Sequence, residues 1–403
     1  SVECTTMTAE KIVAAQFNDT FVPIMDGVGN VTKNYAYWIH KHHGTCCAVV
    51  PQVPKYEDRE DFPVLRFRSL PIPGKDPWRL GIPKLDAAIQ KQLSQINFTI
   101  LHTHCPFTSG ELALKIAEER KIPLVTTFHS KYREDFEKQL RVSGMIDWAM
   151  KKIMKFYQSV DYVWVPNEGT RRELQSYGCT KDIEVMRNGT DLQAPDAEQF
   201  EKYRGRGLER AGVPDNTFVM LFVGQHRWLK NIGLIIDSAE LLAERGRDFL
   251  ILFVGTGTDE SEIKRTVRQK GLKEKIRFLG RIIEREEIKE LYAASDLFLF
   301  PSLYDTASLV MREAAAFSVP SVLVEGASTA EGVTDGRNGF ISANNADAYA
   351  DLLGRLMDNH DIIKEAGRGA RETIYQSWET IVDLVVERYR EIQKEYRQLH
   401  RRE

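Results

Sequence analysis

Two carboxylates that flank a predicted helix start are the residues of this sequence best placed to do chemistry. A buried strand is predicted to end at Phe300, a short loop carries Asp305, and a helix is predicted to begin near residues 306–308. Glu313 lies about two turns into that helix, at about 3.6 residues per turn. We expect both carboxylates to face one site, with the free amide groups of the helix start between them. Such amides suit a diphosphate.

Glu313 can also be interpreted without a ligand. In that interpretation Asp305 is the N-cap of the helix and Glu313 is a charge on its surface. However, Glu313 is followed by three alanines and Phe317, so this part of the helix is predicted to be buried. A buried carboxylate without a partner is energetically costly. We therefore expect a polar ligand to be the partner of Glu313.

Three other predicted strand-to-helix junctions contain glycine. They are residues 26–30 (DGVGN), residues 224–231 (GQHRWLKN) and residues 254–258 (VGTGT). Glycine at a helix start lets a phosphate approach backbone N–H groups. Lys230 in the second junction suits a phosphate as a point charge. Each junction alone is equally an ordinary turn, so only the whole set predicts a phosphate site.

The elements that position these junctions follow from alternating apolar and amphipathic stretches. Near-continuous apolar strands that alternate with helices indicate parallel sheets covered on both faces. Helices are predicted between the strands, for example at 109–120, 231–245, 259–270, 284–294 and 309–317. The predicted strands are 12–17, 46–50, 64–67, 98–102, 123–128, 162–165, 218–223, 249–254, 276–279, 296–300, 320–324 and 339–341.

This pattern runs twice, with a polar break at 190–217 that we interpret as an inter-domain connection. A chain of 403 residues is also too long for one core. We expect domains at 1–192 and 193–375, followed by a long helix over 376–403 that packs back toward the first domain. A membrane- or partner-binding tail is the alternative for that helix. Ligands of open α/β sheets bind at the carboxyl ends of the strands.

Composition excludes several classes of protein. With 42% hydrophobic and 28% charged residues, the chain is not a disordered one. The formal charge of −3 argues against nucleic acid as a partner, and no apolar run reaches the roughly 18 residues of a membrane span. The five cysteines form no C-x-x-C, so neither a disulfide framework nor a zinc site is expected. No G-x-G-x-x-G follows the first strand, which disfavours a nicotinamide dehydrogenase. We expect a cytoplasmic protein.

The junctions, in this order and spacing, resemble those of the retaining glycosyltransferases of family 4. The resemblance covers nearly the whole chain and includes a T-x-H pattern at 127–129, an N-G-x-D at 188–191 and the segments 331–333 and 335–340. It implies the GT-B fold, in which two Rossmann-like, doubly wound parallel-sheet domains face each other across a cleft. It also implies a retaining, metal-independent hexosyltransferase that needs no cofactor besides its substrate nucleotide sugar.

The resemblance further implies roles for individual residues. The catalytic roles fall on His129, Asp305 and Lys230. Acceptor binding falls on Asn30, His104, Lys131 and Tyr132. Donor binding falls on Gly27, Gly29, Gln225, Arg227, Lys230, Gly255, Thr306, Ala307, Ser308, Leu309, Val310 and Glu313.

Two positions depart from the pattern of that family. Asp305 stands where the family has glutamate, and Gln225 stands where it has an arginine that binds phosphate. We expect Arg227 to supply the missing cation. The implied mechanism is a front-face transfer in which backbone amides and Lys230 stabilise the leaving diphosphate. His129 would orient the donor sugar and the acceptor. Closure of the two domains is expected to accompany the transfer.

The resemblance favours uridine diphosphate as the nucleotide and glucose as the sugar, with galactose, mannose and N-acetylglucosamine left open. Segments 101–107 and 128–132 look like those of enzymes that glycosylate diacylglycerol. Residues 131–158 contain seven Lys or Arg against four acids, interleaved with Trp148 and other apolar side chains. Such a pattern predicts a helix on an anionic membrane surface, which would place the protein at the inner face of the membrane. An ordinary solvated helix is the alternative.

Three other functions remain open from the sequence. The first is transfer to a soluble acceptor such as a sugar, a polyol or a thiol precursor. The second is a sugar-nucleotide epimerase, which would share the fold and act without an acceptor. The third is a non-catalytic protein that binds nucleotide sugars, in which Gln225 and Asp305 are signs of decay. The oligomeric state is not predicted.

Overall fold

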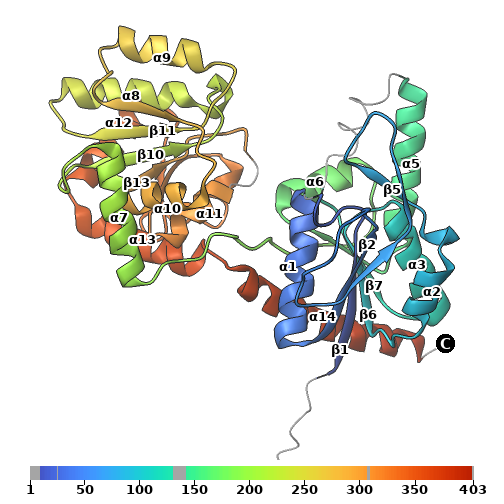
Figure 1. Cartoon of the computed structure of the whole chain (residues 1–403). Coiled ribbons are helices and arrows are strands. Elements are labelled where there is room, and N and C mark those ends of the chain that lie inside the picture. The colour runs from blue at the N-terminus through green and yellow to red at the C-terminus, as the bar shows by residue number, and fades with distance from the viewer. Residues whose placement is uncertain (1–9, 25, 130–141, 306–308, 402–403) are drawn as a thin grey trace, which may run out of the picture. The chain divides into compact units, whose positions relative to one another are not determined.

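The computed structural model describes residues 10–24, 26–129, 142–305 and 309–401. The chain divides into two compact units, and Figure 1 shows helices on both faces of each sheet. Unit 1 contains residues 1–189 and 378–403, and unit 2 contains residues 190–377. The sequence places these boundaries at 192/193 and 375/376.

The sheet of unit 1 has seven parallel strands in the order β3-β2-β1-β6-β7-β8-β9. Alternate residues of a strand point to opposite faces. In the interior strand β1, Ile12 and Ala14 therefore enter one core and Ala15 and Phe17 enter the other. The strands are β1 (Ile12–Phe17), β2 (Gly44–Pro51), β3 (Val64–Phe67), β6 (Ile100–Thr103), β7 (Leu124–Thr127), β8 (Tyr162–Val165) and β9 (Ile183–Val185). A separate antiparallel hairpin joins β4 (Ser69–Pro71) and β5 (Arg79–Gly81).

Six α-helices and a short 3-10 helix are described in unit 1. They are α1 (Gly27–His42), η1 (Pro83–Leu85), α2 (Ala87–Ser94), α3 (Thr108–Arg120), α5 (Ser143–Ser159), α6 (Glu168–Ser176) and α14 (Trp378–His400). The last of these, α14, comes from the far end of the chain and packs against α1 and β1. Its buried side chains Ile381, Val385 and Tyr389 share one core with Tyr35 of α1.

The sheet of unit 2 has six parallel strands in the order β12-β11-β10-β13-β14-β15. Met220 and Phe222 of β10 enter the core under α8 and α12, whereas Val219 and Leu221 enter the core under α7, α10 and α11. The strands are β10 (Val219–Val223), β11 (Leu250–Val254), β12 (Ile276–Gly280), β13 (Leu297–Leu299), β14 (Ser321–Val324) and β15 (Phe340–Ser342). The helices are α7 (Ala197–Ala211), η2 (Trp228–Lys230), α8 (Ile232–Glu244), α9 (Glu260–Gln269), α10 (Arg285–Ala294), α11 (Leu309–Ala316), η3 (Ser328–Ala330), α12 (Ala346–Met357) and α13 (His360–Thr373).

Two doubly wound parallel sheets confirm the predicted fold class. In each sheet the strand order reverses beside the first strand of the unit, between β1 and β6 in unit 1 and between β10 and β13 in unit 2. Open α/β sheets bind ligands beyond the carboxyl ends of the strands at such a switch point. The residues after Phe17 and Thr103, and those after Val223 and Leu299, are therefore the ones to inspect.

One prediction about the organisation of the chain was wrong. The stretch 190–217 is not only a connection, because α7 lies within it. The Asp196 and Gln199 side chains form a capping box at its start, and Gly212 in the left-handed region ends it. A Cβ on Gly207 would lie 2.0 Å from the Glu290 carbonyl of α10. This polar helix is held by close backbone packing rather than by a wide apolar stripe, so its composition did not indicate a helix.

Candidate functional site

The predicted site residues fall into two groups, one in each unit. Gly27, Gly29, Asn30, His104 and His129 belong to unit 1. Unit 2 contains Gln225, Arg227, Lys230, Gly255, Asp305, Leu309, Val310 and Glu313. Five further predicted residues lie outside the described part of the chain: Lys131, Tyr132, Thr306, Ala307 and Ser308.

The start of α1 is already capped by a negatively charged side chain. Asp26 is its N-cap, and Asp26 Oδ1 accepts hydrogen bonds from the Gly29 amide at 2.7 Å and from Thr20 Oγ1 at 2.9 Å. The Gly29 amide is thus not free for a phosphate while Asp26 caps the helix. A Cβ on Gly27 would meet no atom within 4 Å, so Gly27 leaves open space there. The side-chain amide of Asn34 donates to the Asn30 carbonyl at 2.9 Å.

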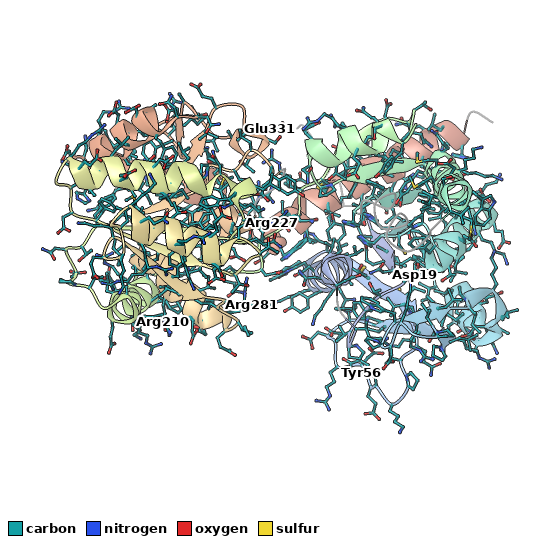
Figure 2. The ribbon with its side chains drawn as sticks, turned by 90° about the horizontal axis from the view of Figure 1, so that it is seen from above. Asp19, Tyr56, Arg210, Arg227, Arg281 and Glu331 are labelled. Carbon is teal, nitrogen blue, oxygen red and sulfur yellow. The ribbon has the colours of Figure 1, made fainter. Side chains whose placement is uncertain are left out.

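A second carboxylate serves α3 in the same way. Asp19, which follows β1 (Figure 2), accepts hydrogen bonds at Oδ1 from Thr108 Oγ1 at 2.7 Å and from the Ser109 amide at 3.2 Å. Both helix starts next to the switch point of unit 1 therefore carry their own negative charge. This charge disfavours a diphosphate near them, in contrast to the sequence-based assignment of Gly27 and Gly29 to the donor.

Two predicted residues of unit 1 do meet. His104 follows β6, His129 follows β7, and their atoms His104 Nδ1 and His129 Nε2 lie 3.1 Å apart. The His104 ring also stacks on the ring of His102, with centroids 4.4 Å apart. Burial lowers the pKa of His129 to about 3 and holds the pKa values of His102 and His104 well below the usual range. All three imidazoles are therefore neutral near pH 7.

Sequence reasoning missed the partners of these histidines, which are Gln16, His102 and Tyr389. Two of them carried a usable signal. Gln16 is a polar residue in an otherwise apolar strand, and His102 stands two residues before His104, the spacing that puts two side chains on the same side of an extended backbone. Tyr389 carried none, because it lies 287 residues from His102.

In unit 2 the turns that contain Gly224 and Gly255 pack closely against each other through their backbones. Gly255 has φ +128°, and a Cβ on it would lie 2.0 Å from the Gly224 carbonyl oxygen. The turns are joined by hydrogen bonds from the Gly224 amide to the Val254 carbonyl at 3.0 Å and from the His226 amide to the Thr256 carbonyl at 3.1 Å. Gly255 therefore shapes the loop that carries Gln225, whatever else it contacts.

Lys230 and Asp305 form an ion pair at the carboxyl ends of β10 and β13. Lys230 Nζ donates to Asp305 Oδ1 at 2.5 Å, and the side chains are only 14% and 19% exposed. Asp305 Oδ2 is buried and has no hydrogen-bond partner among the described residues. Because an ammonium has three donors and a carboxylate has two oxygens, each group keeps capacity for a polar ligand.

Two other polar residues of this loop, Gln225 and Arg227, have room for a ligand as well. Arg227 is half-buried at the surface of unit 2 (Figure 2), and its guanidinium makes no hydrogen bond or ion pair with any residue that the structure describes. Gln225 is exposed. The Lys230 ammonium also lies 5.3 Å from the centroid of the Tyr304 ring. Arg227 and Lys230 thus bring two cations to the turn that follows β10.

Glu313 is buried, as predicted, but its partners are protein groups. It is 3% exposed, Tyr292 Oη donates to its Oε2 at 2.9 Å, and Arg285 Nη2 donates to its Oε1 at 2.9 Å. A polar ligand was the expected partner of Glu313, whereas the structure gives it two protein donors, both from α10, which no local sequence pattern reveals. Burial, and then the Glu313 carboxylate, raise the pKa of Tyr292 well above its usual value. Leu309 and Val310 lie in the first turn of α11.

Helix α5 has a buried apolar face and an exposed face of mixed character. Ile146, Met150 and Ile153 are buried in the core of unit 1. Trp148 is 67% exposed. The exposed face, which we call the α5 face, contains two apolar side chains, three lysines and one acid: Met145, Asp147, Trp148, Lys151, Lys152 and Lys155.

Residues of neighbouring elements continue the α5 face. Glu111 of α3 pairs with Lys152 at 3.4 Å and with Lys84 of η1 at 3.0 Å, so η1 lies beside α5. Leu85, next to Lys84, is 75% exposed. Of the helices that the structure describes, none has the length and apolar character needed to cross a bilayer. In the same part of the chain, no three His, Cys, Asp or Glu side chains are grouped to hold a metal ion.

Two family models match the sequence. The model described as Glycosyltransferase Family 4 matches residues 25–194, and the model described as Glycosyl transferases group 1 matches residues 208–373. The first falls largely in unit 1, and the second falls within unit 2.

Individual proteins are similar over most of the chain. An alpha-monoglucosyldiacylglycerol synthase of Streptococcus pneumoniae is 25% identical over 76% of this chain and 69% of its own. A protein of the same name from Acholeplasma laidlawii is 21% identical over 94% of this chain and 98% of its own. Among solved structures, Anabaena HepE in complex with UDP-glucose has a TM-score of 0.59 at 16% identity, over 93% of this chain and 98% of that one.

Proposed function

We propose that this chain, which belongs to the family 4 glycosyltransferases of the GT-B fold, transfers glucose from UDP-glucose to a hydroxyl group of a lipid such as diacylglycerol. The observation that carries the donor half is the Lys230–Asp305 pair at the switch point of unit 2, with the unpartnered Asp305 Oδ2 beside it. A sugar diphosphate combines an anion with hydroxyl groups. The pair offers N–H donors for the anion and an acceptor oxygen for a hydroxyl.

We propose that the reaction retains the configuration of the anomeric carbon and needs no metal. The acceptor hydroxyl attacks that carbon on the face from which the diphosphate departs. The bond from the anomeric carbon to the phosphate oxygen breaks, and the hydroxyl proton passes to the leaving diphosphate. Lys230 and Arg227 stabilise the negative charge that develops there. His129, a neutral imidazole, orients the reacting hydroxyl by a hydrogen bond.

The choice of donor is supported by the names of similar proteins, and its location by the charges in the two units. HepE, which shares the fold, was solved with UDP-glucose, and two relatives are named for products that contain glucose. In unit 1 the helix starts of α1 and α3 are capped by Asp26 and Asp19. The diphosphate is therefore assigned to unit 2, where Arg227 and Lys230 supply the cations.

The choice of a lipid acceptor is supported by the α5 face. Exposed Trp148 and Met145 suit the interface between headgroups and acyl chains, and the three lysines suit anionic headgroups. The relatives named above are synthases of a glycosylated diacylglycerol. We propose that this face holds the enzyme on the inner leaflet of an anionic membrane, where the acceptor is presented.

The test is a product assay with a panel of donors and acceptors. The protein is incubated with UDP-glucose, UDP-galactose, UDP-N-acetylglucosamine or GDP-mannose, together with diacylglycerol in phosphatidylglycerol vesicles or with water-soluble sugars and polyols. Mass spectrometry should detect hexosyl-diacylglycerol from UDP-glucose, and NMR should show the α anomer. Transfer only to a soluble acceptor would overturn the lipid assignment. Nucleotide-sugar binding without turnover would identify a non-catalytic binding protein, and epimerised donor would identify an epimerase.

A further inference from the structure

A continuous chain of hydrogen-bonded side chains runs through unit 1 and ends at His129. Gln16 is its centre. The side-chain nitrogen Nε2 of Gln16 lies 3.2 Å from Tyr389 Oη, and its oxygen Oε1 lies 2.8 Å from His104 Nε2. Tyr389 Oη lies 2.5 Å from His102 Nδ1, and His104 Nδ1 lies 3.1 Å from His129 Nε2. Four of these five residues are fully buried.

These side chains come from four separate elements. Gln16 of β1 and His102 of β6 are direct partners in the parallel register. His104 follows β6, and Tyr389 comes from the C-terminal helix α14. Buried polar groups are almost always hydrogen-bonded, and each unmade bond is costly. The network therefore allows few arrangements of its protons.

The orientation of the Gln16 amide determines where the protons lie. Cys46 Sγ lies 3.8 Å from Gln16 Nε2, and the Cys46 thiol donates to the Cys47 carbonyl. The sulfur is therefore left as an acceptor, which suits the NH₂ group and not the oxygen of the amide. Tyr389 accepts the other amide proton and can donate its own to His102 Nδ1. His102 Nε2 then donates to Thr127 Oγ1 at 2.7 Å.

The remaining bonds follow in sequence. Gln16 Oε1 can only accept, so His104 Nε2 carries a proton. In a neutral imidazole the other nitrogen is then an acceptor, so His104 Nδ1 accepts from His129 Nε2–H. His129 Nδ1 is left without a proton. It makes no hydrogen bond with the residues that the structure describes.

We propose that Gln16, His104 and Tyr389 are positioning residues that hold His129 as its neutral Nε2–H tautomer and present Nδ1 as an acceptor for a substrate hydroxyl. The inference rests on the proposed function, in which His129 orients the hydroxyl that reacts. It gives α14 a part in catalysis, because Tyr389 accepts a proton of the amide in the orientation that Cys46 Sγ favours and so helps to hold that orientation. A flipped Gln16 amide would reverse every bond and turn His129 Nδ1 into a donor.

The tautomer can be observed directly in the full-length protein. Histidine labelled with ¹⁵N gives two-bond ¹H–¹⁵N spectra that distinguish protonated from unprotonated ring nitrogens, and His129→Asn assigns the His129 signals. Wild-type His129 should be the Nε2–H tautomer. Gln16→Leu removes the acceptor for the His104 Nε2 proton, so His129 should become a mixture of tautomers.

Tyr389→Phe should act like Gln16→Leu, because the amide then loses the hydroxyl that accepts its second proton and only the weak contact with Cys46 Sγ favours its orientation. The matched control is Tyr162→Phe. It removes a hydroxyl that donates at 2.9 Å to Glu395, which lies in α14 as Tyr389 does, but this hydroxyl is not part of the hydrogen-bonded network around Gln16. For both Gln16→Leu and Tyr389→Phe we expect kcat to fall about tenfold with the KM for the donor unchanged. Tyr162→Phe should keep wild-type kcat.

Two results would overturn the proposal. One is an Nδ1–H tautomer at His129 in the wild-type protein. The other is a folded Gln16→Leu or Tyr389→Phe protein that keeps both the wild-type tautomer and the wild-type kcat, with folding checked by circular dichroism. The proposed function can fail separately. If wild-type protein transfers no sugar, the spectra still decide whether the network sets the tautomer.

Discussion

Lys230 and Asp305, which are 75 residues apart in the chain, form an ion pair of 2.5 Å with both side chains mostly buried. The lysine and the aspartate that the sequence predicts for the donor site are therefore direct partners. A donor diphosphate must bind the donors of Lys230 that Asp305 does not use. A sugar hydroxyl can bind the oxygen of Asp305 that Lys230 does not reach.

Replacing Lys230 by methionine should damage both stability and activity. The buried Asp305 carboxylate would lose its counter-charge, so we expect the free energy of unfolding to fall by about 2 kcal/mol, below the range for fully buried pairs. Urea unfolding measures this loss. The double variant Lys230→Met/Asp305→Asn should recover the stability but not the transfer activity, because the cation for the diphosphate is still absent. A double variant with wild-type activity would show that the pair is only structural.

Arg227→Ala should weaken the binding of UDP-glucose about tenfold, the effect of losing one charge-assisted contact of about 1.4 kcal/mol. Isothermal titration with UDP and with UDP-glucose measures it. The control is Arg268→Ala, which removes an exposed arginine at the end of α9. If Arg227→Ala binds the donor as wild-type protein does while Lys230→Met does not bind it, Arg227 does not replace the arginine missing at Gln225.

Trp148→Ser should lower co-sedimentation with phosphatidylglycerol vesicles by about tenfold, since an aromatic anchor at the interface is lost. Lys151→Gln/Lys155→Gln should lower it by at least as much at low salt, at about 1 kcal/mol per lysine. Leu399→Ser is the matched control, because Leu399 is 62% exposed on a different helix. Binding that is equal for all these proteins, or absent in the wild type at low salt, would remove the membrane role of the α5 face.

Acid should destabilise unit 1 through its neutral histidines. The pKa of His129 is lowered by burial to about 3, against about 6.5 in an unfolded chain. Between these values the unfolded chain binds a proton that the folded protein does not. The free energy of unfolding therefore falls as the pH is lowered through this window, by about 1.4 kcal/mol per pH unit for this group. Above pH 6.5 the contribution of the neutral histidine is complete.

His129→Asn should remove this part of the pH dependence. Urea unfolding at pH 7, 6 and 5 should show a shallower loss of stability for the variant than for the wild type. Equal slopes for the two proteins would mean that folding does not lower the pKa of His129. In that case burial would not be what keeps the imidazole neutral.

Local sequence was sufficient for most of the buried strands. Strands with apolar residues on both faces, such as 12–17 and 218–223, were found where the pattern predicts them, because burial on both sides of a parallel sheet leaves few polar positions. The short strand Ile183–Val185 was missed, since an edge strand is only half-buried and Glu184 interrupts it. Helix α7 was missed because close backbone packing replaced its apolar stripe.

What the sequence by itself determined was therefore the two doubly wound units and the junctions that carry Lys230, Asp305 and His129. Only the tertiary structure decided which groups are partners. Tyr292 and Arg285 are the hydrogen-bond donors to Glu313, and Gln16 and Tyr389 hydrogen-bond to the buried histidines. These bonds join residues that are 21 to 373 positions apart in the sequence. Periodicity reports whether a side chain is buried. It cannot report the partner, because the partner of a buried polar group is chosen by packing between elements that are distant in the chain.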